Sequence, residues 1–358
     1  MTREDLEFSA AIEQILTDED LAGQDLSGAR LAKAQLLRCD LRGCRLAGAD
    51  ISHAAFIECD LSEVDFSGAR FDGTRLVQCD LRRSRLAGDL ITFSTFMLCD
   101  LSDAAVEVSL LEKCHLLTCT MHRTAYRRVT TYAVTFVETA FEAVDFSGSD
   151  FSNTAFIGVD MQQADLTDVR LRKSMFSNGK FRGLDLSGKQ ITECALVEAD
   201  LSGVDLRGAD LSGSIFAGSR FQRADLRGVT ATNALFAECD LSGCRLDHAR
   251  LDQAVFAGAT LDVARFDRAS MVQAMLQGAS ARGAVFRAAD LRNGDLAGMR
   301  LESCDMRALR LDHAGLQDIE QRDCFWDGTD FETVRKPDPE LSSIARYDPR
   351  QPYREDLE

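Results

Sequence analysis

The stretch CDLRGCRLAGADISHAAFIECDLSEVDFSG, residues 39–68, repeats a five-residue pattern in which every fifth residue is large and apolar. The same spacing runs without insertion or deletion from Leu21 to Phe331. A period of five fits neither a helix, with about 3.6 residues per turn, nor a flat strand, with a period of about two. The pattern therefore predicts a solenoid that turns a corner every five residues and stacks its turns to bury the apolar positions. All but four of the 63 positions are large and apolar, and the exceptions are Thr131, Ala231, Ala281 and Gln321.

Two positions of each five-residue unit are expected to point inward. We name the large apolar residue the centre, and the residue two positions before it, mainly Ala, Cys, Ser, Thr or Val, the small inward residue. The other three positions are expected to face outward, and the frequent Gly among them eases the corner. All twelve cysteines occupy the small inward position, without an accompanying His or a CxxC motif. We interpret them as small core residues with free thiols, which are typical of a reducing compartment.

Four units make one coil, because several residue types recur at a spacing of twenty. The cysteines of one column and the Phe centres of one side show this spacing: Cys39, Cys59, Cys79, Cys99 and Cys119, and Phe56, Phe96, Phe136, Phe156, Phe176, Phe216, Phe236 and Phe256. Stacking like residues from coil to coil is what a solenoid with a twenty-residue turn requires.

Units such as ADLSG, residues 209–213, and VDFSG, residues 144–148, resemble the A(D/N)LXX motif of the pentapeptide-repeat family. The resemblance covers residues 19–333. It implies an all-β fold, a right-handed quadrilateral (four-sided) β-helix of about 15.5 coils of twenty residues. One unbroken repeat favours a single β-helix domain over residues 19–333.

The two ends of a solenoid need covers. Near-helical spacing of Leu6, Ile12, Ile15 and Leu16 predicts an N-terminal cap helix in residues 3–17, within a cap region of residues 1–18. All four prolines lie in the last part of the chain, so residues 334–358 are expected to form a Pro-containing tail that packs over the last coil or extends toward a partner.

Composition restricts the function. A net charge of −17 disfavours direct binding to nucleic acid or to an anionic membrane. The acidic N-terminus lacks a signal-peptide core, and no apolar run is long enough to span a membrane, so a cytoplasmic location is expected. The five His are scattered, and no motif of a nucleophile, phosphate loop or metal site occurs. We expect a protein without catalytic, cofactor-binding or metal-binding residues.

One side of the coil carries apolar residues at positions that face outward. These predicted partner-binding residues are Leu37, Ile57, Val77, Met97, Leu117, Val137, Ile157, Met175, Ile215 and Leu235. Apolar patches of this kind usually mark interfaces, so we expect a protein partner or a second copy of the chain to bind here. The alternatives are that the residues serve β-propensity alone or that the chain's own termini cover them.

A second candidate zone breaks the charge pattern. Residues 129–169 contain acids but no Lys, Arg or His, and a basic cluster comes directly before them. Repeat consensus is also weakest from about Asp89 to Thr139. A possible recognition zone therefore comprises His122, Arg123, Arg127, Arg128, Asp145, Asp150, Asp160 and Asp165, against the simpler interpretation of a solvated irregularity.

Two functions follow as hypotheses. The first is a non-enzymatic scaffold or adaptor that uses the apolar side. The family resemblance implies that long members accompany bacterial secretion systems, including type VI secretion as accessory or effector-loading factors. The second is a DNA mimic that binds a topoisomerase such as gyrase, as acidic members of the family do. The apolar side favours the first, and the acidic coils favour the second.

Overall fold

The structure is a computed structural model that describes residues 1–335. The chain divides into two compact units, residues 1–179 and the described residues from 180 onward. Both are built from turns of twenty residues, and the chain is the right-handed four-sided β-solenoid expected from the sequence. Most of the predicted tail, from residue 336 onward, lies outside the described residues, and the predicted single domain over 19–333 stays a prediction.

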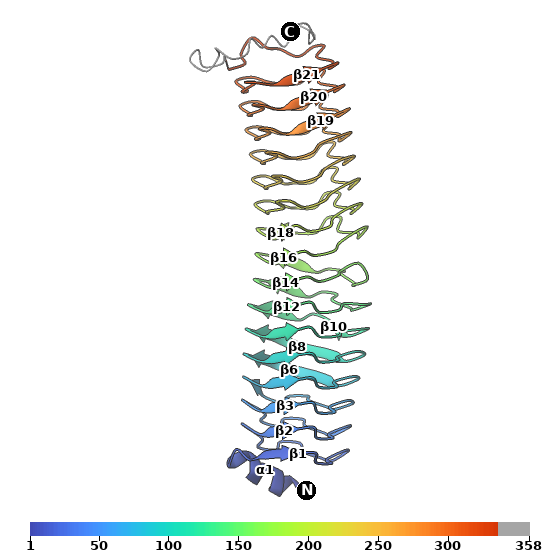
Figure 1. Cartoon of the computed structure of the whole chain (residues 1–358), viewed down its shortest axis with the longest axis vertical. Helices are drawn as coiled ribbons and strands as arrows, with labels where there is room; N and C mark the ends of the chain where they lie inside the picture. Colours follow the sequence, from blue (N-terminus) through green and yellow to red (C-terminus); the bar gives the residue numbers. More distant parts are fainter. Residues whose placement is uncertain (336–358) are drawn as a thin grey trace, which may run out of the picture. The chain divides into compact units, whose positions relative to one another are not determined.

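In the first unit, one side of the coil forms a parallel sheet in which each strand lies beside the strand twenty residues further along (Figure 1). Leu36 pairs with Phe56, and Phe56 pairs with Leu76. The twenty-residue coil is therefore confirmed. The strands of this sheet are β1 (Ile15–Thr17), β2 (Gln35–Leu37), β3 (Ala55–Ile57), β5 (Arg75–Val77), β7 (Thr95–Met97), β9 (His115–Leu117), β12 (Thr135–Val137), β14 (Ala155–Ile157) and β16 (Met175–Ser177).

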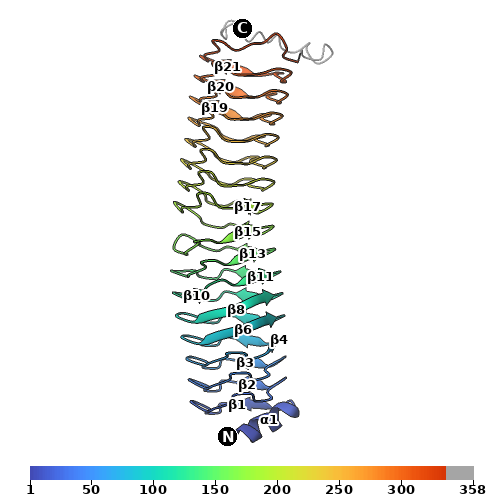
Figure 2. The same cartoon turned by 180° about the vertical axis from the view of Figure 1, so that it is seen from behind.

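A second parallel sheet of the first unit, seen from behind in Figure 2, is formed by the preceding side of each coil. Thr131 pairs with both Leu111 and Phe151, again at a spacing of twenty. Its strands are β4 (Phe71–Asp72), β6 (Arg85–Thr92), β8 (Ala105–Glu112), β11 (Thr130–Tyr132), β13 (Asp150–Ser152) and β15 (Arg170–Arg172), and β10 (Ala125–Tyr126) also pairs with β8.

The second unit has fewer regular strands but keeps the spacing of twenty residues between coils. Isolated bridges such as Ile215 to Leu235 and Leu235 to Val255 join successive coils at a spacing of twenty. Its named strands are β17 (Ile191–Thr192), β18 (Ala195–Val197), β19 (Ser280–Arg282), β20 (Arg300–Glu302) and β21 (Glu320–Arg322).

The unit of residues 41–45 shows why five residues suffice for one side. Gly43, at the corner, adopts a φ of 63°, where a residue without Cβ has no steric cost. Every N–H of this unit has an acceptor, which explains why proline is excluded from the repeat. The acceptors are Asp60 O for Leu41, Asp40 Oδ1 for Arg42, Ser62 O for Gly43, Leu41 O for Cys44 and Gln24 O for Arg45, at 2.8–3.0 Å.

The centres form the core of each unit, where like side chains stack. In the first unit the ring centroids of Phe136 and Phe156 lie 5.0 Å apart with planes 4° from parallel. In the second unit Phe216 and Phe236 stack at 5.1 Å. Aromatic contact of this kind adds to the burial of the large apolar surface that stabilises a stack of coils.

The N-terminal helix is shorter than expected. The helix α1 spans Arg3–Ala11, begins with a capping box between Thr2 and Asp5, and buries Leu6 against the first coil. The prediction that it extends through residue 17 was wrong. Residues 15–17 form β1, because Leu16 lies five residues before Leu21 and acts as the first centre of the repeat. Near-helical spacing of the apolar residues could not distinguish the two structures.

Strands β6 and β8 depart from the regular coil, since each continues straight through a corner. Asp89 occupies a small inward position, where an ionised carboxylate would be costly to bury. The strand therefore turns Asp89 outward to an exposed position, and β8, in register with β6, exposes Ser109 in the same way. Val108, at the corner, is buried instead. The expectation that every small inward residue points inward fails at these two positions.

Candidate functional site

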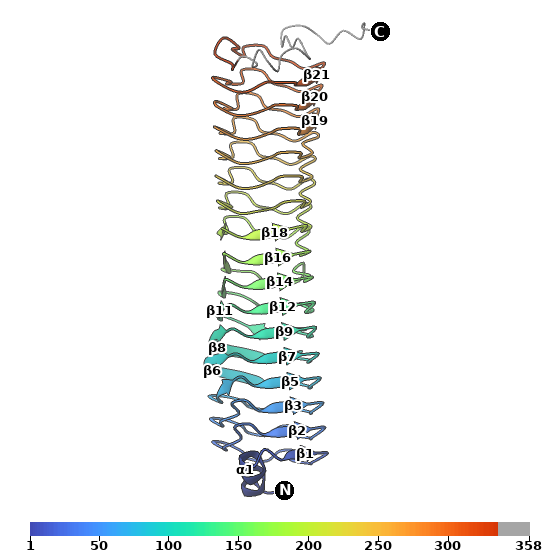
Figure 3. The same cartoon turned by 60° about the vertical axis from the view of Figure 1, so that its left-hand side comes forward.

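The first apolar column has one residue from each of seven strands of the first sheet, β2, β3, β5, β7, β9, β12 and β14. Its members are Leu37, Ile57, Val77, Met97, Leu117, Val137 and Ile157. Each follows a buried centre and faces outward, and each is half-buried or exposed, as in the pattern of β3, where Phe56 is buried and Ile57 is 37% exposed. The column follows one side of the first unit (Figure 3). Met175 of β16, predicted to join it, lies at the other outward position of the same side and is 42% exposed.

The second apolar column lies in the second unit and consists of Ile215, Leu235, Val255 and Met275. Bridges join each member to the next coil, so that the four side chains stand one above another. Ile215 and Met275 are 41% and 46% exposed. The sequence thus correctly assigned outward positions to Ile215 and Leu235, although no contact in the structure shows that they bind a partner.

Four exposed apolar residues in and near the straightened strands were not identified as a site from the sequence. Leu90, Phe93 and Leu98, all in one coil of the first unit, are 45%, 55% and 50% exposed. Tyr132, about two coils after Phe93 in the sequence, is 50% exposed. The available signal was Asp89 at an inward position, which marks the coil whose corner is straightened.

The predicted basic cluster is largely neutralised by neighbouring coils. His122 Nδ1 lies 3.1 Å from Glu142, Arg123 pairs with Asp103 at 2.7 Å, and Arg127 pairs with Asp145. The backbone N–H of Arg128 donates to Ser147 O at 3.0 Å, and its guanidinium is the one basic group of the cluster that makes no ion pair among residues 1–335.

The acids of this zone also serve the turns of the solenoid. Asp145, Asp160 and Asp165 each accept a hydrogen bond from the N–H two residues later, at 2.8–3.0 Å. Burial tends to raise the pKa of Asp145, but hydrogen bonds from Ser147 and Arg127 outweigh it and lower that pKa. Asp150 instead accepts a bond from the Ser152 hydroxyl at 2.5 Å. The structural explanation therefore accounts for much of the acidic zone.

The cysteines are buried, apart from Cys324, which is half-buried. Burial raises the pKa of Cys114 to about 11 and that of Cys239 to about 12, which makes both thiols poor nucleophiles. Within residues 1–335, no three His, Cys, Asp or Glu side chains are grouped so that they could hold a metal ion. No helix in that part of the chain is long and apolar enough to cross a membrane.

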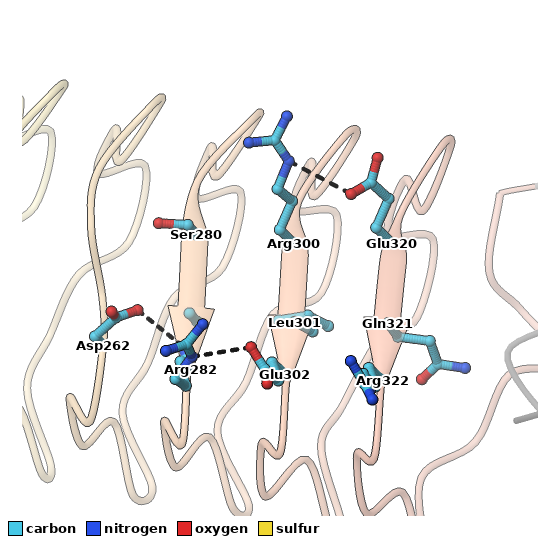
Figure 4. Close-up of a pocket in the computed structure, with 10 residues that line it drawn as sticks. Asp262, Ser280, Arg282, Arg300, Leu301, Glu302, Glu320, Gln321 and Arg322 are labelled. Carbon is cyan, nitrogen blue, oxygen red and sulfur yellow. Dashed lines mark hydrogen bonds and ion pairs between the residues drawn. The ribbon is translucent and has the colours of Figure 1, made fainter. Parts of the chain in front are cut away.

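A depression of about 650 Å³ lies over β19, β20 and β21 of the second unit (Figure 4). Its charged side chains bind one another: Arg282 donates to Glu302 at 2.9 Å, and Arg300 lies 3.4 Å from Glu320. Because the charges at its centre are already paired, the depression offers little to attract a charged ligand.

Together, the stacked five-residue units define a β-solenoid of pentapeptide coils with outward apolar columns. A family model of pentapeptide repeats matches eight segments that together cover more than half of the chain, and the chain belongs to this family. The matched segments are residues 12–43, 25–62, 44–83, 135–172, 156–188, 194–233, 234–273 and 269–307. The unmatched residues 84–134 include the straightened strands.

Solved structures with a similar fold include QnrB1, a plasmid-mediated fluoroquinolone resistance protein, and HetL of the cyanobacterium Nostoc sp. strain PCC 7120, which is involved in heterocyst differentiation regulation. QnrB1 is 17% identical, over 56% of this chain and 92% of its own, with a TM-score of 0.36. HetL is 21% identical, over 92% of this chain and 95% of its own, with a TM-score of 0.23. A search of curated proteins gave no matching sequence.

Proposed function

We propose that this protein is a non-enzymatic protein-binding scaffold whose contact surfaces are the first and second apolar columns. The observation that carries the proposal is the position of these side chains. They follow or precede the buried centres, they are half-exposed or exposed, and the core is complete without them. Outward apolar residues repeated over many coils are not needed to fill the core between the inward centres, and such patches are typical of interfaces.

A narrower form of the proposal is supported by the family resemblance alone. It makes the chain a cytoplasmic bacterial adaptor, an accessory or effector-loading factor of type VI secretion. Partners captured at the apolar columns would then be components of that secretion system or its effectors. The topoisomerase-binding alternative receives less support, because Arg127 pairs with Asp145 within the acidic zone.

Site-specific photo-crosslinking tests the proposal. A photoreactive residue replaces Met97 in the full chain in cells, and Ala47, half-buried on a different side of the coil, serves as the matched control. We expect discrete protein adducts from position 97 that are absent from position 47. The same adducts from both positions, or none from position 97 and from Leu235 in the second unit, would contradict the proposed use of the columns.

A further inference from the structure

We infer that the first apolar column is occupied by a second copy of this chain, packed face to face with its coils running in the opposite direction. The inference rests on the proposed function, since it names the occupant of a surface proposed there to bind protein. It starts from the order of side chains along the column, which reads alike in both directions: Ile57, Val77, Met97, Leu117, Val137, Ile157.

This order fits a two-fold axis that is parallel to the strands and lies midway between β7 and β9. It places Met97 opposite Leu117 of the second copy, Val77 opposite Val137, and Ile57 opposite Ile157. A symmetric dimer needs such a self-complementary surface, because each contact is made twice. From Ile57 to Ile157 the column therefore meets residues of similar size and polarity, whereas Leu37 lies opposite Ser177 of the second copy.

The other outward position of the same strands supports the antiparallel register. Among the residues at this position in the first-sheet strands from β2 to β16, only Arg75 is an Asp, Glu, Lys or Arg. The others are Gln35, Ala55, Thr95, His115, Thr135, Ala155 and Met175. In the antiparallel pair Arg75 lies opposite Thr135, whose hydroxyl can accept a hydrogen bond. If each coil faced its own counterpart instead, Arg75 would lie opposite Val77, and its charge would be buried without a partner.

The relief of the surface is consistent with the same register. A hollow of about 420 Å³ lies beside the lower part of the column, and Gln35, Ala55 and Ile57 contribute to its lining. Met175, 42% exposed, lies at the other end of the sheet and faces the coil of Gln35 of the second copy. A flexible Met side chain fills irregular hollows well. Symmetry repeats this contact at both ends of the interface.

The area that the two copies can bury limits the strength of the proposed dimer. The coils from β2 to β16 extend over roughly 38 Å at about 4.8 Å per coil, and a face about 10 Å wide offers roughly 400 Å² per copy. The pair therefore buries on the order of 800 Å², more once side-chain relief is included, which is below the roughly 1,200–2,000 Å² of stable interfaces and in the range of weak, transient ones. We expect a reversible dimer that forms with increasing protein concentration.

A charge-pair experiment tests both the occupant and the register. Sedimentation velocity of the full chain from low micromolar to near-millimolar concentration should show a shift from one to two chain masses. V77K and V137E should each weaken dimerisation at least about tenfold, because each places a charge against an apolar residue. The double variant V77K/V137E, and an equimolar mixture of the single variants, should recover to within about threefold, since the introduced lysine then faces the introduced glutamate of the other copy.

Leu110→Lys, on the second sheet, is the matched control and should dimerise like the wild type. Thermal melts establish that all variants fold. A wild-type chain that stays monomeric throughout overturns the inference, as does a double variant that fails to recover while remaining folded. If the chain is monomeric but position 97 still crosslinks to other proteins, the second copy is excluded and the proposed function stands.

Discussion

The Nζ of Lys113 lies 4.9 Å from the centre of the Phe93 ring, one coil away at the same corner of the first unit. Phe93 is 55% exposed and takes a φ of 49°, a conformation that a bulky residue rarely adopts. The cation over its face partly compensates for exposing an aromatic ring to water. Under the two-fold axis inferred above, the same corner brings Phe93 toward Lys113 of the second copy, so this pair lies at the rim of the proposed interface.

Surface and core positions of one strand should respond differently to substitution. The triple variant Met97→Ser, Leu117→Ser, Val137→Ser should lower the unfolding free energy less than the loss of a buried centre does, because these half-buried side chains lie on the outer face and not in the core. It should lose self-association. Phe96→Ala, which empties a buried centre next to Met97, should lower the unfolding free energy by about 3–5 kcal/mol. Thermal melts and sedimentation check both; a triple variant as unstable as Phe96→Ala would contradict the outward assignment.

The acidic zone should not protect a topoisomerase. Since Arg127 and Asp145 form an ion pair and Asp165 accepts a turn hydrogen bond, we expect excess protein to leave gyrase supercoiling unchanged. The Asp145, Asp150, Asp160 and Asp165→Asn variant provides the comparison. Inhibition or protection that weakens steeply with salt and disappears in this variant would instead support the DNA-mimic hypothesis, because exposed charges are screened over about 8–10 Å.

Acid should destabilise the solenoid through its turn aspartates. The hydrogen bond from Arg227 is the largest influence on Asp225 and lowers its pKa below the ordinary 3.8, although burial opposes it. A depressed carboxyl pKa stabilises the fold above the unfolded-state pKa, and this contribution is lost as pH falls through the folded-state value.

We therefore expect the melting temperature of the wild type to fall below about pH 4. Asp225→Asn should show a smaller acid-dependent loss, and Arg227→Gln, which removes the donor, should behave similarly. Thermal melts between neutral and acidic pH measure these differences. Parallel profiles for wild type and Asp225→Asn would show that the bond does not contribute to acid sensitivity.

Thiol reactivity should separate Cys324 from the other cysteines. Cys324 is half-buried, and its hydrogen bond with Cys304 lowers its pKa to about 7. At mildly alkaline pH, a thiol reagent should label this residue rapidly in the native chain, and Cys324→Ser should abolish the fast phase. All twelve cysteines should react after denaturation. Rapid native labelling of Cys114 would contradict its burial.

The five-residue register determined the solenoid and most of the inward positions, and the recurrence of Cys and Phe at a spacing of twenty determined the coil. A period of five with one large residue has no other way to bury its apolar side chains than by turning corners and stacking. The same register placed Met97 and Ile215 on the outside, because side chains next to an inward centre must point outward.

Tertiary structure decided the features that depend on interactions between neighbouring coils. Leu16 joined the first strand rather than the helix because its backbone pairs with Leu36. Asp89 turned outward and straightened β6, and β8 followed because its backbone hydrogen bonds hold it in register. The ion pair of Arg127 with Asp145 and the contact of His122 with Glu142 depend on which side chains reach across coils, which spacing alone does not specify. These outcomes depend on burial cost and pairing between residues about twenty positions apart, beyond the reach of a local pattern.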